Sequence, residues 1–172
     1  ESPMKTRNKL PQMTDQTFLT DGGLETWLIF DKGIDMPCFA SFALLDDISV
    51  VESMKQYYRN HLEIACRHGA GFILESPTWR ASADWARELK MDNEDLCRLT
   101  VKAVRLMSDI RDAAPTGQPT MVISGNIGPR SDGYDPAFHM TADEAEAYHT
   151  PQIRTMVEAG AEMIGALTMT YT

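Results

Sequence analysis

Polar residues that could contact a ligand follow three short apolar segments of the sequence. Asp21 lies directly before two glycines, Gly22 and Gly23, in "LTDGGLETW". Glu75 ends the apolar run of "AGFILES", and Asn126 ends that of "VISGNIGP". Carboxylates accept hydrogen bonds from a substrate amine, and glycines let backbone N–H groups approach a ligand. The set predicts a small-molecule site, although an aspartate before a glycine also caps turns and a strand-end glutamate also forms ion pairs.

Other kinds of catalytic site leave no trace in the sequence. It contains no G-x-S-x-G, H-E-x-x-H or paired C-x-x-C motif, and "SGNIGPRSDGY" matches neither a P-loop nor a dinucleotide-binding fingerprint. Cys38, Cys66 and Cys97 are far apart, whereas zinc ligands usually come in closely spaced pairs. We therefore predict no metal site from these cysteines and expect buried thiols in a reducing compartment.

Composition and charge limit the classes of partner. The 172 residues suffice for one domain, and a formal net charge of -9 argues against nucleic acid and anionic membranes as partners. The longest apolar run, residues 39–45, is far shorter than the roughly 20 residues of a membrane span. Residues 1–16 contain no apolar signal-peptide core, so we expect a flexible N-terminal arm and a cytoplasmic protein.

Apolar runs and helical patterns alternate along residues 17–172. Buried strands are expected to start near residues 18, 71, 120 and 162, the last one covering residues 163–170. Helices are expected over about 48–67 and from about 92 to the residues before Pro115. Thr141 and Glu144 form a capping box that opens a further helix, which Pro151 is expected to interrupt.

This alternation predicts an α/β fold with a parallel sheet. The chain length favours a doubly wound open sheet, since a complete (β/α)8 barrel needs about 250 residues. The loops are long after each strand and short after each helix, which places the site at the carboxyl ends of the strands in either architecture.

Four segments, taken in order, resemble the homocysteine S-methyltransferase family. They are "LTDGGLETWL", "GAGFILESPTWRAS", "VISGNIGPRSDGY" and "YHTPQIRTMVEAGAEMIGALT". The resemblance implies a (β/α)8 TIM-barrel type fold, of which residues 17–172 would be the first four βα units, a half-barrel or fragment. It also implies a transferase of methionine biosynthesis that moves a methyl group from a small donor to a homocysteine-type thiol.

The resemblance assigns roles to residues of the loops. Asp21 matches the family's substrate-binding aspartate, Gly22 and Gly23 bring backbone close to the amino acid, and the loop of Thr78 lines the pocket. With Glu75, Asn126 and Thr168, these residues form the predicted substrate-binding set. No catalytic residue is assigned within the chain.

Two departures from the family pattern bear on activity. The family activates the thiol with zinc bound by cysteines in "G-x-N-C" and "G-G-C-C" motifs, and neither motif occurs here. The zinc ligands are therefore expected in a part of the barrel outside this sequence, and this chain alone is expected to be inactive. The family also has a glutamate at the end of strand four, where this chain has Leu167 before Thr168.

These departures keep an alternative open. The chain could be a non-catalytic half-barrel that binds a small molecule or associates with a second copy of itself. The sequence does not determine the methyl donor. Leu167, which stands where the family has a glutamate, also weakens the case for homocysteine itself as the acceptor.

Overall fold

Parallel strands in sequence order form the centre of the molecule. The computed structural model describes residues 10–134 and 139–171. Within them, one four-stranded sheet has the order β1-β2-β3-β4, and every neighbouring pair is parallel. The strands are β1 (Phe18–Leu19), β2 (Gly71–Glu75), β3 (Met121–Ile127) and β4 (Met163–Ala166). The expected α/β class with a parallel sheet is thus confirmed, and β1 lies at an edge, unlike the first strand of a doubly wound sheet.

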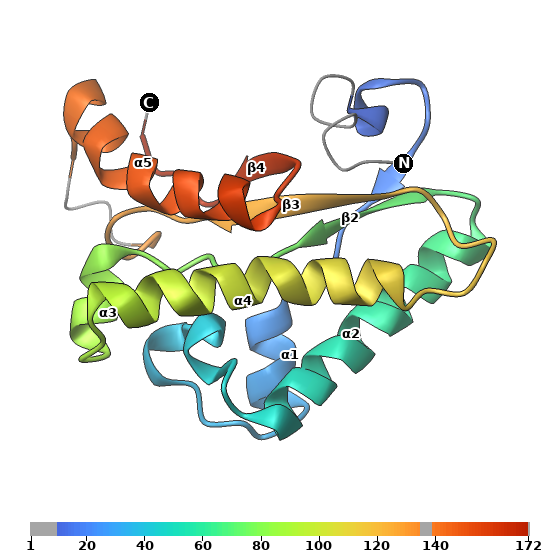
Figure 1. Cartoon of the computed structure of the whole chain (residues 1–172), viewed down its shortest axis with the longest axis horizontal. Coiled ribbons are helices and arrows are strands. Elements are labelled where there is room, and N and C mark those ends of the chain that lie inside the picture. Colours follow the sequence, from blue (N-terminus) through green and yellow to red (C-terminus); the bar gives the residue numbers. More distant parts are fainter. Residues whose placement is uncertain (1–9, 135–138, 172) are drawn as a thin grey trace.

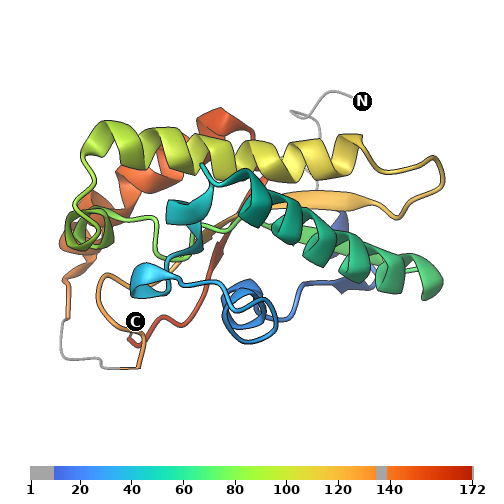
Figure 2. The ribbon, with the colours of Figure 1, turned by 90° about the horizontal axis from the view of Figure 1, so that it is seen from below.

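The helices that connect the strands are α1 (Leu24–Phe30), α2 (Ile48–Arg67), α3 (Ala83–Glu88), α4 (Asn93–Asp112) and α5 (Ala142–Ala159). The long helices α2, α4 and α5 form one layer on the sheet, and the short helices α1 and α3 pack against α2 and α4. Helix α2 packs on β2, α4 packs on both β3 and α2, and α5 packs on both β3 and α4. Figures 1 and 2 show α2 and α4 side by side along the strands from two directions. The core lies between this layer and the sheet.

Side-chain caps and apolar faces explain the two long helices. The carboxylate of Asp47 accepts hydrogen bonds from the backbone N–H groups of Ser49 and Val50 at the start of α2. Asp92 caps α4 in the same way by accepting from the N–H of Asp95. Both expected helices are confirmed, and each buries an apolar side, although Ile48 at the start of α2 is 81% exposed.

Two sequence predictions about the last helix and strand are wrong. Helix α5 runs through Pro151 without a break. Proline leaves the carbonyl four residues earlier without an intrahelical donor, and that residue, Ala147, is exposed to water. Strand β4 ends at Ala166 instead of continuing to residue 170, because Thr168 adopts a left-handed backbone with φ 55°.

The surroundings of the cysteines also differ from expectation. Cys66 and Cys97 are exposed and Cys38 is partly exposed, so they are not the buried thiols that were predicted. In α2, the buried stripe passes through Leu62 and Ala65, which turns the next residue, Cys66, toward solvent.

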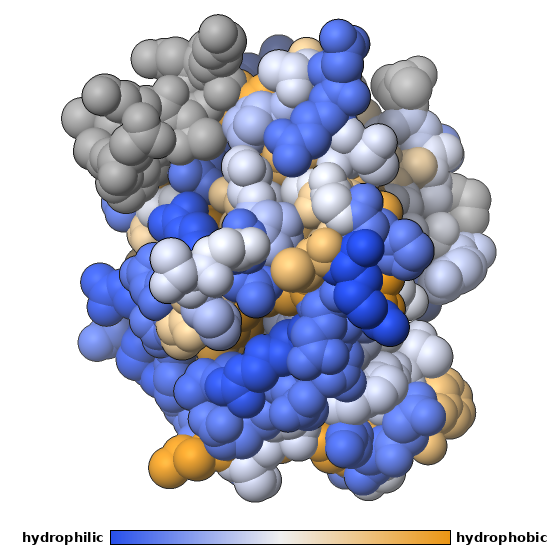
Figure 3. Space-filling view, turned by 90° about the vertical axis from the view of Figure 1, so that its right-hand side faces the viewer, coloured by the Kyte–Doolittle hydropathy of each residue, from blue (hydrophilic) through white to orange (hydrophobic). Residues whose placement is uncertain are grey.

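A short segment before β1 contacts the far edge of the sheet. Residues 1–9 of the predicted arm lie outside the described residues, but a short 3-10 helix at Pro11–Met13 precedes β1. Gln12 Nε2 donates a hydrogen bond to Met163 Sδ at 2.9 Å, which connects this segment to β4. Figure 3 faces the end of the molecule at which the strands begin, where the surface is mainly hydrophilic.

Further short helices occupy segments that the sequence predicts as irregular. Residues 37–44 form two 3-10 turns, and α3 lies in the stretch after β2. No helix among the residues described is long and apolar enough to cross a membrane.

The capping box of α5 offers a test of how its first turn is stabilised. Thr141 Oγ1 accepts from the N–H of Glu144, and the Glu144 carboxylate accepts from the N–H of Thr141. Thr141→Ala should lower the free energy of unfolding by about 1 kcal/mol, because both hydrogen bonds are disturbed. Thr141→Ser, which keeps a hydroxyl, should lose little in the same urea titration. Equal losses in both variants would contradict a capping role.

Candidate functional site

Polar residues from all four strand ends meet around one cavity. Asp21 follows β1, Glu75 ends β2, Asn126 lies near the end of β3, and Thr168 follows β4. The cavity has a volume of about 990 Å³. Because parallel strands all finish at the same edge of the sheet, residues distant in sequence come together there.

The seven residues predicted for substrate binding do not all reach the cavity. Five of them line it: Asp21, Gly23, Glu75, Asn126 and Thr168. Gly22 lies beside it, where its N–H donates to Tyr57 Oη at 3.0 Å. Thr78 is fully buried beneath its loop, and its hydroxyl donates to the carbonyl of Asn126 at 2.7 Å. Their binding roles stay predictions.

Helix α2 fixes the position of the first loop. Tyr57 Oη donates to Asp21 Oδ2 at 3.0 Å while it accepts from Gly22. Gly23 caps α1 with φ 113°, a conformation that residues with a side chain rarely adopt. The carboxylate of Asp21 is therefore held by a side chain 36 residues further along the chain.

The loop after β2 is tied to both neighbouring strands. Ser76 Oγ accepts from the N–H of Asn126 on β3. Trp79 Nε1 donates to Thr168 Oγ1 at 3.0 Å, which connects the loop to the end of β4. Gly128 lets the chain pass closely under this loop, since a Cβ there would lie 2.6 Å from the Trp79 carbonyl oxygen. These contacts make one rim of the cavity.

Three partly buried carboxyl groups dominate the electrostatics of the cavity. Burial, together with the neighbouring Asp21 and Glu25, raises the pKa of Glu75 to about 7. Burial also raises the pKa of Asp21, against the lowering effect of its hydrogen bond from Tyr57. The pKa of Glu25 is raised by burial as well, although the Ser41 hydroxyl donates to it at 2.6 Å.

One guanidinium faces these carboxylates among the described lining residues. Arg80 stacks on Trp85, with 4.0 Å between the guanidinium carbon and the ring centroid, and on Trp79 at 4.8 Å. It donates to the carbonyl of Cys38 at 2.6 Å and lies 3.7 Å from the Asp132 carboxylate. The two indole rings hold the cation at the mouth of the site.

Sequence reasoning missed several residues that line this cavity or hold its lining residues in place. Glu25 lies within the "LTDGGLETW" segment, four residues after Asp21, but a glutamate in a first helical turn is ordinary. Tyr57 carries no local signal, because it belongs to the buried side of a long helix. Cys38 lines the cavity from a segment that was predicted as irregular.

The described residues do not provide a metal centre. Within them, no group of three or more histidine, cysteine or acidic side chains could hold a metal ion. Cys38, Cys66 and Cys97 all remain free thiols. The zinc that the resemblance implies therefore finds no fitting ligand set in this part of the chain.

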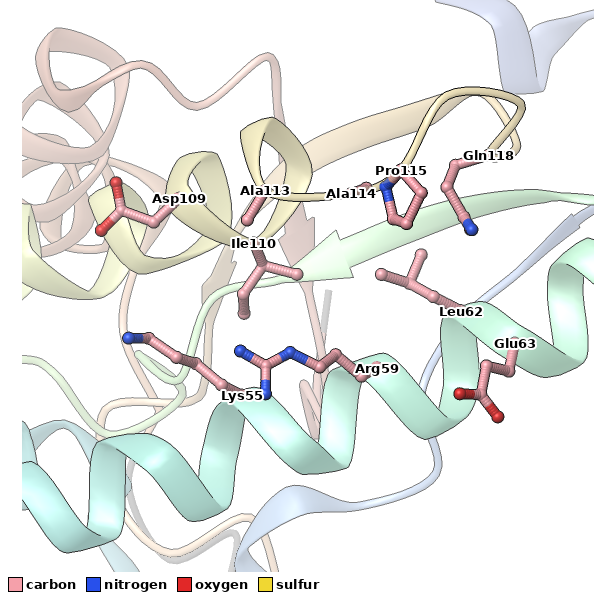
Figure 4. Close-up of a pocket in the computed structure, with 10 residues that line it drawn as sticks. All are labelled: Lys55, Arg59, Leu62, Glu63, Asp109, Ile110, Ala113, Ala114, Pro115 and Gln118. Atoms are coloured by element: carbon pink, nitrogen blue, oxygen red, sulfur yellow. The ribbon is translucent and has the colours of Figure 1, made fainter.

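A second cavity lies away from the strand ends. It has a volume of about 500 Å³ and separates α2 from the end of α4. Figure 4 shows Lys55 and Arg59 extending from α2 toward α4, with Leu62 and Ile110 between the helices. None of the residues predicted for substrate binding lines it, so the candidate site is the cavity at the strand ends.

Comparisons with known proteins agree with the fold. The fold and site define an α/β protein with a small-molecule cavity at the carboxyl ends of parallel strands. A model of the family described as homocysteine S-methyltransferase matches residues 18–172. The chain belongs to the homocysteine S-methyltransferase family. No curated protein sequence matches it.

Solved structures support the same fold. The oxidized form of the homocysteine methyltransferase MmuM from Escherichia coli has a TM-score of 0.72 at 20% identity, over 98% of this chain and 57% of that one. The metallated form has a TM-score of 0.70 at 19% identity, over 98% and 58%. The chain therefore spans less than two thirds of the proteins it resembles.

The raised pKa of Glu75 predicts how stability depends on pH. The folded protein keeps a proton on Glu75 up to about pH 7, whereas the unfolded chain releases it near the ordinary glutamate pKa. Stability is therefore lost as the pH rises through this range. Glu75→Gln should recover about 1–2 kcal/mol near pH 8 and almost nothing near pH 5, after allowance for partial exposure of the side chain.

Urea unfolding of both proteins at the two pH values measures this difference. Glu63→Gln, at an exposed position on α2, is the matched control and should show no such pH dependence. A stability gain from Glu75→Gln that is equal at both pH values would refute the assignment.

Proposed function

We propose that the chain forms the acceptor-binding part of a thiol S-methyltransferase that methylates homocysteine or a similar amino acid. The observation that carries this proposal is the cavity at the strand ends, where the Asp21 carboxylate is held by Tyr57 beside Glu75. Family membership supports the reaction class, and the carboxylates support an amine-bearing substrate.

We also propose a half-barrel as the architecture. Its support is the consecutive order of four parallel strands and the single layer formed by α2, α4 and α5. A (β/α)8 barrel is built from this unit repeated around an axis. The coverage of 57% of the MmuM chain fits the same interpretation.

The side chains of the cavity suggest how an amino acid would be oriented. Asp21 and Glu75 can bind its ammonium group, and the Arg80 guanidinium lies where it can bind a carboxylate. Asn126 Oδ1 is buried without a hydrogen-bond partner and offers a further acceptor. These contacts would fix the position of the acceptor.

Zinc remains a proposal for the complete enzyme. In the family it would supply a thiolate at neutral pH by binding the substrate sulfur. The metallated MmuM structure is consistent with a metal in such enzymes. Since the described residues of this chain provide no group for a metal, we assign thiol activation to none of them.

One observation favours a second candidate function. The described residues combine a well-formed cavity with no metal-binding group. A small-molecule-binding half-barrel, with or without self-association, would have these properties and would need no catalytic residue. It would bind an amino-acid thiol without transferring a methyl group. Cytoplasmic location remains a prediction for either function.

Asp21→Asn tests the proposed binding site. The substitution removes the charge but keeps an oxygen that can accept from Tyr57, so the fold should be retained. Binding of L-homocysteine, measured by titration calorimetry, should weaken about tenfold or more because a charge-assisted hydrogen bond is lost.

Asp31→Asn is the matched control for this test, because Asp31 is exposed at the end of α1. It should leave homocysteine binding unchanged. Equal affinity of the Asp21 variant and the unaltered chain would remove Asp21 from the site. Absence of any homocysteine binding by the unaltered chain would argue against the proposed acceptor.

A further inference from the structure

A third cavity lies between two of the long helices. It has a volume of about 350 Å³ and is bounded by α4, by α5 and by residues 81–83 at the start of α3. Helices α4 and α5 pack against each other, and Figures 1 and 2 show them side by side. None of its described lining residues also lines the cavity at the strand ends. A ligand held here would therefore be separate from the proposed acceptor.

The described lining of this third cavity is polar but carries no charge. It contains no acidic, basic or histidine side chain, in contrast to the carboxylates at the strand ends. Hydroxyl and amide groups line it together with the apolar side chains of Leu96 and Pro151. Burying an ion without a counter-charge is costly, so this lining suits an uncharged polar ligand.

Two threonines of the cavity can act only as hydrogen-bond acceptors. Thr100 Oγ1 donates to the carbonyl of Leu96 at 2.7 Å, and Thr155 Oγ1 donates to the carbonyl of Pro151 at 3.0 Å. A hydroxyl group has a single O–H donor but two lone pairs. Each threonine oxygen therefore offers a ligand an acceptor and no donor.

Donors remain at the opposite side of the lining, near α3 and the start of α4. Tyr148 Oη donates to Ser82 Oγ at 2.9 Å, which leaves the Ser82 hydroxyl with its own O–H group. Asn93 is exposed at the first position of α4 and carries an amide with two N–H donors. The cavity thus combines acceptors with a smaller set of donors.

Gln152 provides an independent observation that points to a ligand. Its side chain lines the cavity with 8% of the residue exposed. Nε2 donates to the carbonyl of Thr78 at 3.4 Å, whereas Oε1 is buried without a hydrogen-bond partner. His149 is near enough to interact with Gln152, but the contact lacks hydrogen-bond geometry and His149 Nδ1 is also left without a partner. A buried acceptor without a donor costs free energy, which an N–H group of a ligand would recover.

We propose that this cavity is a second binding site, for a ligand that carries a primary carboxamide group. Such a group has two N–H donors, which Gln152 Oε1 and a threonine hydroxyl oxygen can accept. Its carbonyl oxygen can accept from Ser82 or Asn93. Cys97 lines the same cavity as an exposed free thiol, so its reactivity reports whether the site is occupied.

Protection of Cys97 from alkylation tests the site in the unaltered chain. Propionamide carries a primary carboxamide, and N,N-dimethylpropionamide is a close analogue without N–H donors. Propionamide should slow the reaction of Cys97 with N-ethylmaleimide along a saturating curve, and the analogue should have no effect. Cys66, an exposed thiol on α2, is the internal reference and should react at a constant rate. Peptide mass spectrometry follows the two cysteines separately.

Gln152→Met adds a second readout, because it keeps the length of the side chain but removes the acceptor. The concentration of propionamide that gives half-maximal protection should rise about fivefold or more through loss of a hydrogen bond. Gln56→Met, at an exposed position on α2, is the matched control and should protect as the unaltered chain does.

Three results would each overturn the proposed site. Equal protection by both amides would show that N–H donors play no part. Failure of propionamide to protect Cys97 would leave water as the occupant of the cavity. Full protection in the Gln152→Met variant would contradict the assigned acceptor. These measurements do not use homocysteine, so they leave the proposed function to its own test.

Discussion

The parallel register of neighbouring strands is the constraint on which the site depends. Backbone hydrogen bonds pair Glu75 of β2 with Ser124 of β3, and Ser124 with Met163 of β4. Alternate residues of a strand point to opposite faces, so Phe72 and Leu74 enter the core beneath the helices while Glu75 faces the cavity. A slip of one residue would turn Glu75 into that core and an apolar side chain into the site. Packing and chemistry are therefore specified by the same backbone pairing.

The cavity itself is maintained at a cost to stability. Burial disfavours the charged forms of Asp21, Glu25 and Glu75, and each has a raised pKa in consequence. Hydrogen bonds from Tyr57 and Ser41 offset part of this cost but leave an excess of negative charge. Such arrangements are typical of binding sites, where the ligand completes the electrostatic balance. Residues that only support the fold are seldom buried in this way.

Much of the fold could be predicted from local patterns, but the contacts of the site could not. The helix at Ile48–Arg67 follows from its apolar stripe, and the capping box at Thr141 is explicit in the sequence. Pro151 misled the prediction because a helix tolerates proline where the unpaired carbonyl meets water. The hydrogen bond from Tyr57 to Asp21 joins residues of different elements, and no spacing in the sequence reveals it. The same holds for Glu75, whose carboxylate lies close to Gly165 of β4, 90 positions later in the chain.

The segment before β1 has a consequence for how the sheet is held together. Strands β1 and β4 are the two edges of the sheet, yet Gln12, six residues before β1, bonds to Met163 at the start of β4. This contact spans the face of the sheet opposite the helices, because Ile164, the neighbour of Met163, packs into the helical core. The segment around Gln12 thus acts as a strap across the two edges. Oxidation of Met163 would convert this sulfur into a polar sulfoxide and so change the hydrogen bond that joins the segment before β1 to β4.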